Sequence, residues 1–386
     1  MDLENLADSK DSDVNNNFKN NVKRANLTCT IENFSNYGNV FKPCGKYFRK
    51  DPYSSYINYL CKTNDLCKNC HGKKSAIKDY HIFDFDLDSK VKCSLYIRPN
   101  GRDAETKDYV SLFLQFKEFS CLKIITLFKF SILNVDEKEE HKLVIGVEKF
   151  DANKNYHYLP KFINKDDLFR KGDILLPNDR LTVCFEIFYL CNNVNASSVS
   201  ETTHIEGPSS MFLDDMSRML NSSRYCDCII KVENHKINVH KCILDARSEV
   251  FRSMLKYKLA GPEASIIEMS EFRLEVVKEM VNYIYTGKSP RVDEMAIEML
   301  EIAEKYKLEG LKLIATESLL NSLNVQNVCE YLEKGEIYSA EILKEFAIRY
   351  IYLNGKEVLN SESWSRIATL YPLLLARIFN VAVRIE

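Results

Sequence analysis

The residues whose types and spacing could bind a metal ion lie close together in the first quarter of the chain. Cys67, Cys70 and His71 have a spacing that zinc can use, and Cys61 or Cys44 could complete a set of four ligands. No second closely spaced pair accompanies them, so the pattern favours a mobile loop rich in lysine and asparagine over a zinc site. Covalent haem attachment through Cys-x-x-Cys-His would require an export chemistry of which the sequence shows no sign. We therefore expect neither a metal nor a cofactor.

The sequence contains no set of residues typical of a catalytic centre. Its 12 glycines form no loop that could cradle a phosphate, and its 7 histidines lie near no serine or cysteine motif of the triad type. His240, which is followed by Lys241, is interpreted as a structural residue at a helix start rather than as a base or a ligand. These observations predict a binding protein rather than an enzyme.

Composition and charge are those of a soluble protein with two or three domains. The chain of 386 residues carries 53 lysines and arginines against 55 aspartates and glutamates, so its net charge of −2 gives no signature of nucleic-acid or anionic-membrane binding. The N-terminus lacks a signal-peptide pattern, and no run of ~18 apolar residues could span a membrane. The 13 cysteines without an export signal indicate a reducing compartment, which is the nucleus or the cytoplasm.

The first half of the chain has the period of β-strands. Apolar residues at alternate positions form one face of segment 108–116, namely Val110, Leu112, Leu114 and Phe116. The opposite face carries Tyr109, Ser111, Phe113 and Gln115. Many short strands with turns such as Pro99-Asn100-Gly101 predict an antiparallel β-sandwich over residues 24–190. We expect disorder at residues 1–23 and an Asn-, Ser- and Thr-rich linker at residues 191–208.

After residue 208 the apolar residues recur with the period of a helix. One stripe covers residues 272–284 and a second covers residues 296–306, and helical patterning continues to the C-terminus with breaks at Asn354-Gly355 and at Pro372. A strand opened by Asp227 precedes these helices. The sequence therefore predicts a multi-domain α+β protein, with an α/β module at residues 209–322 and short helices at residues 323–386.

Three motifs in order resemble a BTB (POZ) domain, which is a dimerising interaction module. They are Tyr225-Cys226-Asp227-Cys228, Val239-His240-Lys241-Cys242 with the residues up to Ser248, and Tyr283-Ile284-Tyr285-Thr286-Gly287-Lys288. Upstream, segments 30–35, 107–112, 128–134 and 175–182 resemble a MATH domain, which is a TRAF-like sandwich. Residues 323–383 resemble three-box and shortened BACK helices, including Ser363-Trp364 and Tyr371-Pro372.

With this order of domains the chain from about Leu27 resembles the MATH–BTB family. Members of this family are substrate adaptors, in which the MATH domain binds a short degron and the BTB domain binds a cullin-type RING ubiquitin ligase. The resemblance implies a homodimer with a cullin-type scaffold and degron-bearing proteins as partners. The competing function is a non-degradative dimeric scaffold that no longer recruits the cullin.

The resemblance also implies a shallow groove for an extended peptide with an apolar residue, a polar residue and a Ser/Thr run. The residues that carry over to this groove are Tyr109, Phe113, Phe128, His157 and Leu159. Phe113 and Phe128 are the aromatic residues that we expect to be exposed; alternatively, both merely cover the sheet. Where relatives have Lys-Asp-Trp-Gly-Phe, this chain has a different run over residues 155–159, so the family's degron preference need not hold.

Residues in the BTB part carry over to a dimer interface and to a cullin-binding surface. The dimer residues are Phe212, Met216, Met219, Asp227, Lys241, Ile243 and Phe379, with Asp227 and Lys241 as a charged pair. An intramolecular core stripe is the alternative for Phe212, Met216 and Met219. The cullin-binding residues are Leu259, Tyr285 and Lys288. Relatives carry an apolar-x-Glu motif where this chain has Leu259-Ala260-Gly261, so the acidic residue is missing or displaced.

Overall fold

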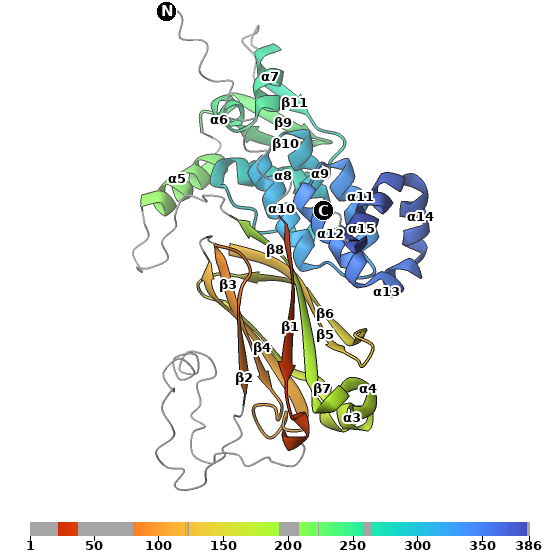
Figure 1. Cartoon of the computed structure of the whole chain (residues 1–386). Coiled ribbons are helices and arrows are strands. Elements are labelled where there is room, and N and C mark those ends of the chain that lie inside the picture. The colour runs from red at the N-terminus through yellow and green to blue at the C-terminus, as the bar shows by residue number, and fades with distance from the viewer. Residues whose placement is uncertain are drawn as a thin grey trace, which may run out of the picture.

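The computed structural model describes residues 22–37, 80–119, 121, 123–192, 208–222, 224–257 and 265–383. These residues form a β-sandwich and a helix-rich part that meet along one side of the sandwich (Figure 1). Some of the predicted segments lie outside the described residues: residues 1–21, the Cys61–His71 segment, residues 193–207 and Leu259. The predicted bounds of the disordered segment 1–23 and of the linker 191–208 are corrected at their ends, because β1 begins at Lys23, β8 ends at Asn192 and the helix α5 begins at Pro208.

Alternating apolar residues build the two antiparallel sheets of the sandwich, whose strand orders are β1-β8-β5-β6 and β2-β3-β4-β7. The strands are β1 (Lys23–Ile31), β2 (His81–Asp86), β3 (Val91–Arg98), β4 (Tyr109–Phe119), β5 (Lys123–Leu133), β6 (Glu139–Phe150), β7 (Tyr156–Asn164) and β8 (Leu181–Asn192). Two short helices, α3 (Lys165–Arg170) and α4 (Gly172–Leu175), connect β7 to β8. The sandwich predicted from the period of two is therefore confirmed.

The predicted inner face of β4 is correct. Val110, Leu112, Leu114 and Phe116 are all buried in the core between the two sheets. The turn at Pro99-Asn100-Gly101 follows the end of β3, and Gly101 has φ +61°. A Cβ atom at Gly101 would lie 2.1 Å from the Thr106 carbonyl oxygen, so both the backbone angle and the close approach require glycine.

Strand β5 is buried on both of its faces, which is unusual for an antiparallel sheet. Its core side carries Ile124, Phe128 and Phe130. Its other side carries Ile125 and Leu127, which belong to the hydrophobic core of the helix-rich part. Apolar side chains on both faces of residues 124–128 thus follow from packing on both sides.

A small sheet and a set of helices form the BTB-like part. Strand β9 (Cys228–Val232) pairs antiparallel with β10 (His235–Val239) and parallel with β11 (Ser265–Glu268). The helices are α5 (Pro208–Ser222), α6 (Lys241–Arg247), α7 (Glu249–Tyr257), α8 (Leu274–Thr286), α9 (Ala296–Lys305) and α10 (Glu309–Asn321). Gly287 ends α8 in a left-handed conformation with φ +68°, which glycine adopts without strain.

The C-terminal helices are α11 (Val328–Ile337), α12 (Glu341–Leu353), α13 (Gly355–Leu359), α14 (Glu362–Leu370) and α15 (Pro372–Val383). The predicted breaks are confirmed, because α12 ends before Asn354 and α15 begins at Pro372, where the missing amide hydrogen is tolerated. Among the described helices, no single one is long and apolar enough to cross a membrane; α14 and α15 meet that test only together, across a bend of 106°.

Candidate peptide-binding and assembly surfaces

A band of aromatic side chains crosses the outer face of the β2-β3-β4-β7 sheet. Phe113 on β4 is paired in register with Tyr96 on β3 and with Tyr158 on β7. The Phe113 ring stacks on the Tyr156 ring with centroids 5.3 Å apart and meets the Tyr96 ring edge-on at 5.5 Å. Such cross-strand pairs fix the rings in one arrangement and leave a rigid apolar surface.

Polar side chains between these rings are held by hydrogen bonds within the sheet. The Tyr96 hydroxyl donates to Gln115 Oε1 at 3.3 Å, and the Ser111 hydroxyl donates to the Pro160 carbonyl oxygen at 2.5 Å. At one edge, Lys117 Nζ lies 2.7 Å from Asp84 Oδ1, and its hydrogen bond, with that from Ser94, holds the pKa of Asp84 below its usual value. The face therefore combines a preorganised aromatic floor with charges at its rim.

The rim of this face is open to solvent. Ile82 on the outer strand is 45% exposed, and the Lys117 side chain is 42% exposed. At the other end Lys161 lies over the Tyr109 ring, with its Nζ 5.3 Å from the centroid. Tyr96 is buried, whereas Phe113, Tyr156 and Tyr158 are half-buried. A rigid, half-buried band of rings with polar neighbours is suited to an extended peptide, whose alternate side chains can contact the rings.

The structure contradicts Phe128, His157 and Leu159 as groove residues. Phe128 is 0% exposed in the sandwich core, where the His157 ring meets it edge-on at 5.5 Å. His157 and Leu159 pair with Leu114 and Leu112, so they point to the core side of β7. Burial lowers the pKa of His157 as a result. Of the residues predicted for the groove, Phe113 and Tyr109 lie on the outer face.

The sequence interpretation missed Tyr96, Tyr156 and Tyr158, which complete the aromatic band. Successive residues of a strand point to opposite faces. An error of one residue in the assignment of a strand therefore exchanges all of its inward-facing and outward-facing residues. The run Tyr156-His157-Tyr158-Leu159 has a tyrosine at every second position. The period of two, applied to this run together with its pairing to β4, would have assigned the tyrosines to the outer face.

Helix α5 presents apolar side chains both to its own chain and to solvent. Met216 and Met219 are half-buried and pack against the core of the BTB-like part, as does Ile243 from α6. Met211 and Phe212 are 60% and 61% exposed. The predicted stripe is thus divided, because its middle packs within the chain while its N-terminal end remains uncovered.

The predicted charged pair is joined through the backbone rather than as an ion pair. Asp227 is exposed, and its Oδ1 accepts a hydrogen bond of 2.8 Å from the backbone N–H of Lys241. This bond satisfies one free amide at the N-terminus of α6. The expectation that a buried Asp227 and Lys241 pair by charge is therefore corrected for the single chain.

The structure contradicts Tyr285 as a cullin-binding residue. Its side chain is buried, and its hydroxyl lies 2.9 Å from the His240 backbone nitrogen and 2.8 Å from His240 Nδ1. Burial raises the pKa of Tyr285 to about 12. His240 Nε2 lies 2.7 Å from the Arg224 carbonyl oxygen, so the interpretation of His240 as a structural residue is confirmed. Lys288 is exposed, in agreement with a surface role.

The C-terminal helix α15 carries a further exposed apolar set. Phe379 is 63% exposed and Leu373 is 81% exposed. Phe379 is therefore accessible to a second molecule, as a residue of an interface must be. Within the described ranges, no group of three or more His, Cys, Asp or Glu side chains is placed to hold a metal ion.

Comparisons with known proteins match both halves of the chain. A family model described as the BTB/POZ domain matches residues 216–323, and one described as the MATH domain matches residues 67–187. TD and POZ domain-containing protein 2 of Mus musculus is 33% identical over 302 residues, which cover 78% of this chain and 83% of that protein.

Two solved structures match the BTB-like part alone. The BTB domain of zebrafish PATZ1 is 23% identical and covers 31% of this chain and 98% of that chain, with a TM-score of 0.26. The BTB domain of human Gigaxonin is 24% identical and covers 30% of this chain and 97% of that chain, with a TM-score of 0.25.

Proposed function

Because this chain belongs to the MATH–BTB family, we propose that it is the substrate adaptor of a cullin-based RING ubiquitin ligase. The architecture itself is that of a protein-interaction module and is typical of adaptors rather than enzymes. In the proposed function the chain acts in the nucleus or the cytoplasm as a homodimer, binds degron-bearing proteins and promotes their ubiquitination and proteasomal degradation.

The observation that carries the proposal is the aromatic face of the β2-β3-β4-β7 sheet. Phe113 lies at its centre, between Tyr96 and the tyrosines of β7, and its ring is only half-buried. A short apolar side chain of an extended peptide could contact this ring while neighbouring polar residues meet the charges of the rim. The face supports a peptide receptor whose preference differs from that of relatives, because the run over residues 155–159 differs.

The proposed dimer and ligase surfaces lie on the helix-rich part. Exposed Met211 and Phe212 on α5 are suited to packing against a second copy, and Phe379 on α15 is a second exposed apolar position. On the ligase side, Leu259 keeps the apolar anchor of the family motif and Lys288 is exposed.

One observation in the sequence favours the second candidate, a dimeric scaffold that does not recruit a cullin. The family motif is apolar-x-Glu, and this chain has Gly261 in place of the glutamate, followed by Pro262-Glu263. Loss of one charged contact at a protein interface weakens binding and can remove it. The two functions therefore differ in a single measurable property, which is affinity for the cullin.

Calorimetric titration of the full chain with a purified cullin distinguishes the two functions. We expect the native chain to bind and Gly261→Glu to bind more tightly. Leu259→Asp should not bind, because it replaces an apolar anchor with a charge that would have to be desolvated in the interface. Gly172→Glu adds the same charge in α4, where a Cβ atom meets nothing within 4 Å, and should bind as the native chain does. If neither the native chain nor Gly261→Glu binds, the scaffold function holds.

A further inference from the structure

The outer face of the β1-β8-β5-β6 sheet has an apolar floor that would be exposed if the sandwich stood alone. Ile125 and Leu127 on β5 are 1% and 0% exposed, and Phe188 and Leu190 on β8 are 0% and 3% exposed. All four belong to the hydrophobic core of the helix-rich part. Phe188 meets the Tyr352 ring of α12 edge-on, with centroids 6.1 Å apart. The helices therefore pack on this face of the sheet and bury its apolar residues.

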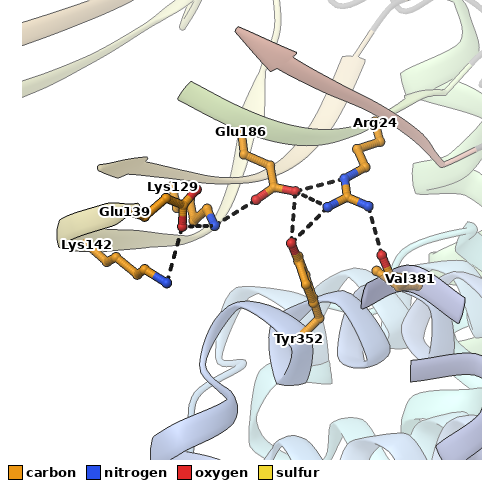
Figure 2. A network of polar contacts seen from close by, with 7 residues as sticks. All are labelled: Arg24, Lys129, Glu139, Lys142, Glu186, Tyr352 and Val381. Carbon is orange, nitrogen blue, oxygen red and sulfur yellow. Dashed lines mark hydrogen bonds and ion pairs between the residues drawn. The ribbon is translucent and has the colours of Figure 1, made fainter. Parts of the chain in front are cut away.

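A network of buried charges lies beside this floor and joins the sandwich to the C-terminal helices (Figure 2). Arg24 of β1 donates from Nε to Glu186 Oε1 at 2.8 Å, and from Nη1 to the Val381 carbonyl oxygen of α15 at 2.8 Å. Its Nη2 donates to the Tyr352 hydroxyl at 2.8 Å. The Arg24 guanidinium thus contacts β8, α12 and α15 at once, in the geometry that suits a planar group with five donors.

The same network continues across the sheet with alternating charge. Lys129 Nζ lies 2.9 Å from Glu186 Oε2 and 2.7 Å from Glu139 Oε2. The side chains of Arg24, Lys129 and Glu186 are 12%, 7% and 2% exposed. Burial opposes both charges, yet the hydrogen bonds between them raise the pKa of Lys129 and lower that of Glu139. Two cations and two carboxylates therefore alternate in one connected network.

A second ion-pair cluster anchors the same face to α10. Glu317 Oε2 lies 2.9 Å from Lys123 Nζ and 3.3 Å from Lys149 Nζ. Lys123 and Lys129 are six residues apart on β5, so the two clusters are about 20 Å apart along the strand. Apolar contact between two bodies permits sliding, whereas two separated polar anchors determine one orientation.

We propose that this face is a docking surface for the chain's own C-terminal helices, and that the Arg24–Glu186–Lys129–Glu139 network fixes the orientation of the sandwich on them. Domains joined by a linker move relative to one another unless the interface between them is large and apolar. Here the apolar floor supplies adhesion. The ion pairs of Arg24 and Lys129 with Glu186 lie within the sandwich, and they hold the Arg24 guanidinium in place. Arg24 can then reach the Val381 carbonyl oxygen and the Tyr352 hydroxyl in only one arrangement of the two parts. The aromatic face on the opposite sheet consequently has a fixed orientation relative to the BTB-like part.

The network can be broken from either side in the full chain. Glu186→Gln removes the carboxylate shared by Arg24 and Lys129, and Tyr352→Ala removes the ring and hydroxyl from α12 while leaving the sandwich sequence intact. We expect both variants to broaden the interatomic distance distribution from small-angle X-ray scattering. We also expect amide hydrogen exchange in α12 and α15 to rise several-fold in both.

Glu32→Gln is the matched control, because Glu32 pairs with Arg180 at 2.6 Å on the exposed surface of the same sandwich. It should leave scattering and exchange at native values. If Glu186→Gln and Tyr352→Ala both match this control, the network does not fix the orientation and the proposal is overturned. Because these measurements use no cullin and no peptide, their outcome is independent of the proposed function.

Discussion

At the scale of single residues, the face of the strand on which an aromatic side chain lies decides whether it is available for binding or belongs to the core. Phe113 and Phe128 are both phenylalanines on central strands of the sandwich. Phe113 faces outward beside Tyr156, whereas Phe128 faces the opposite sheet and contacts His157, Phe130 and Phe185. The first is available to a ligand and the second is required for packing.

Truncation of the two rings should therefore have different effects. Phe113→Ala should weaken binding of a labelled Ser/Thr-rich peptide by about two- to twelvefold in fluorescence anisotropy, because ring contacts of about 0.5–1.5 kcal/mol are lost, with little change in melting temperature. Phe128→Ala should destabilise the sandwich by about 3–5 kcal/mol, since it leaves a cavity in the core. Unchanged peptide binding by Phe113→Ala would place the peptide elsewhere.

At the scale of elements, helix α5 shows how one stripe can serve two surfaces. Its middle residues Met216 and Met219 pack on the chain's own core next to α8, while Met211 and Phe212 are uncovered. A substitution at Met216 or Met219 would disturb both the fold and the proposed dimer. The exposed N-terminal end is the part at which assembly can be tested separately.

The double variant Met211→Asp, Phe212→Asp should yield a folded monomer in light scattering. Met211 and Phe212 are each 60% or more exposed in the single chain, so both positions are available to an interface. In a dimer, aspartates at these positions would be unpaired charges in a dry interface. Ile174→Asp changes an apolar residue of α4 that is 47% exposed on the sandwich, and it should remain dimeric. A dimer that persists in the double variant would show that α5 does not form its core.

At the scale of the whole molecule, the two parts of the chain share a core. Residues of β5 and β8 are buried among helices that lie more than a hundred positions later in the sequence. The sandwich and the helices should accordingly unfold together, because separation of either part exposes the other's apolar surface.

Differential scanning calorimetry of the native chain should show one transition that covers both parts. Leu127→Asp places a charge on the covered face, so it should split this transition into two, one for each part. Val135→Asp, at a position 57% exposed on the sandwich, should retain the single transition. Two native transitions, or a single one in Leu127→Asp, would contradict the shared core.

The sequence by itself determined the architecture and the inner face of β4. Local patterns carry this information: a period of two for β4, a period of about four for α8, and glycines where the backbone needs positive φ, as at Gly101 and Gly287. The three ordered motifs of the BTB-like part were sufficient for the resemblance to a BTB domain. Each of these signals is readable within a short window of residues.

Only the tertiary structure decided which residues share a surface. The register between β4 and β7 turned Tyr156 and Tyr158 outward and His157 inward, and that register depends on residues more than forty positions apart. The burial of Tyr285 and the docking of α12 on β8 likewise depend on long-range packing. One sign of the docking was present in the sequence: over residues 124–128 both faces of β5 carry apolar side chains, which a strand with one face in water would not show.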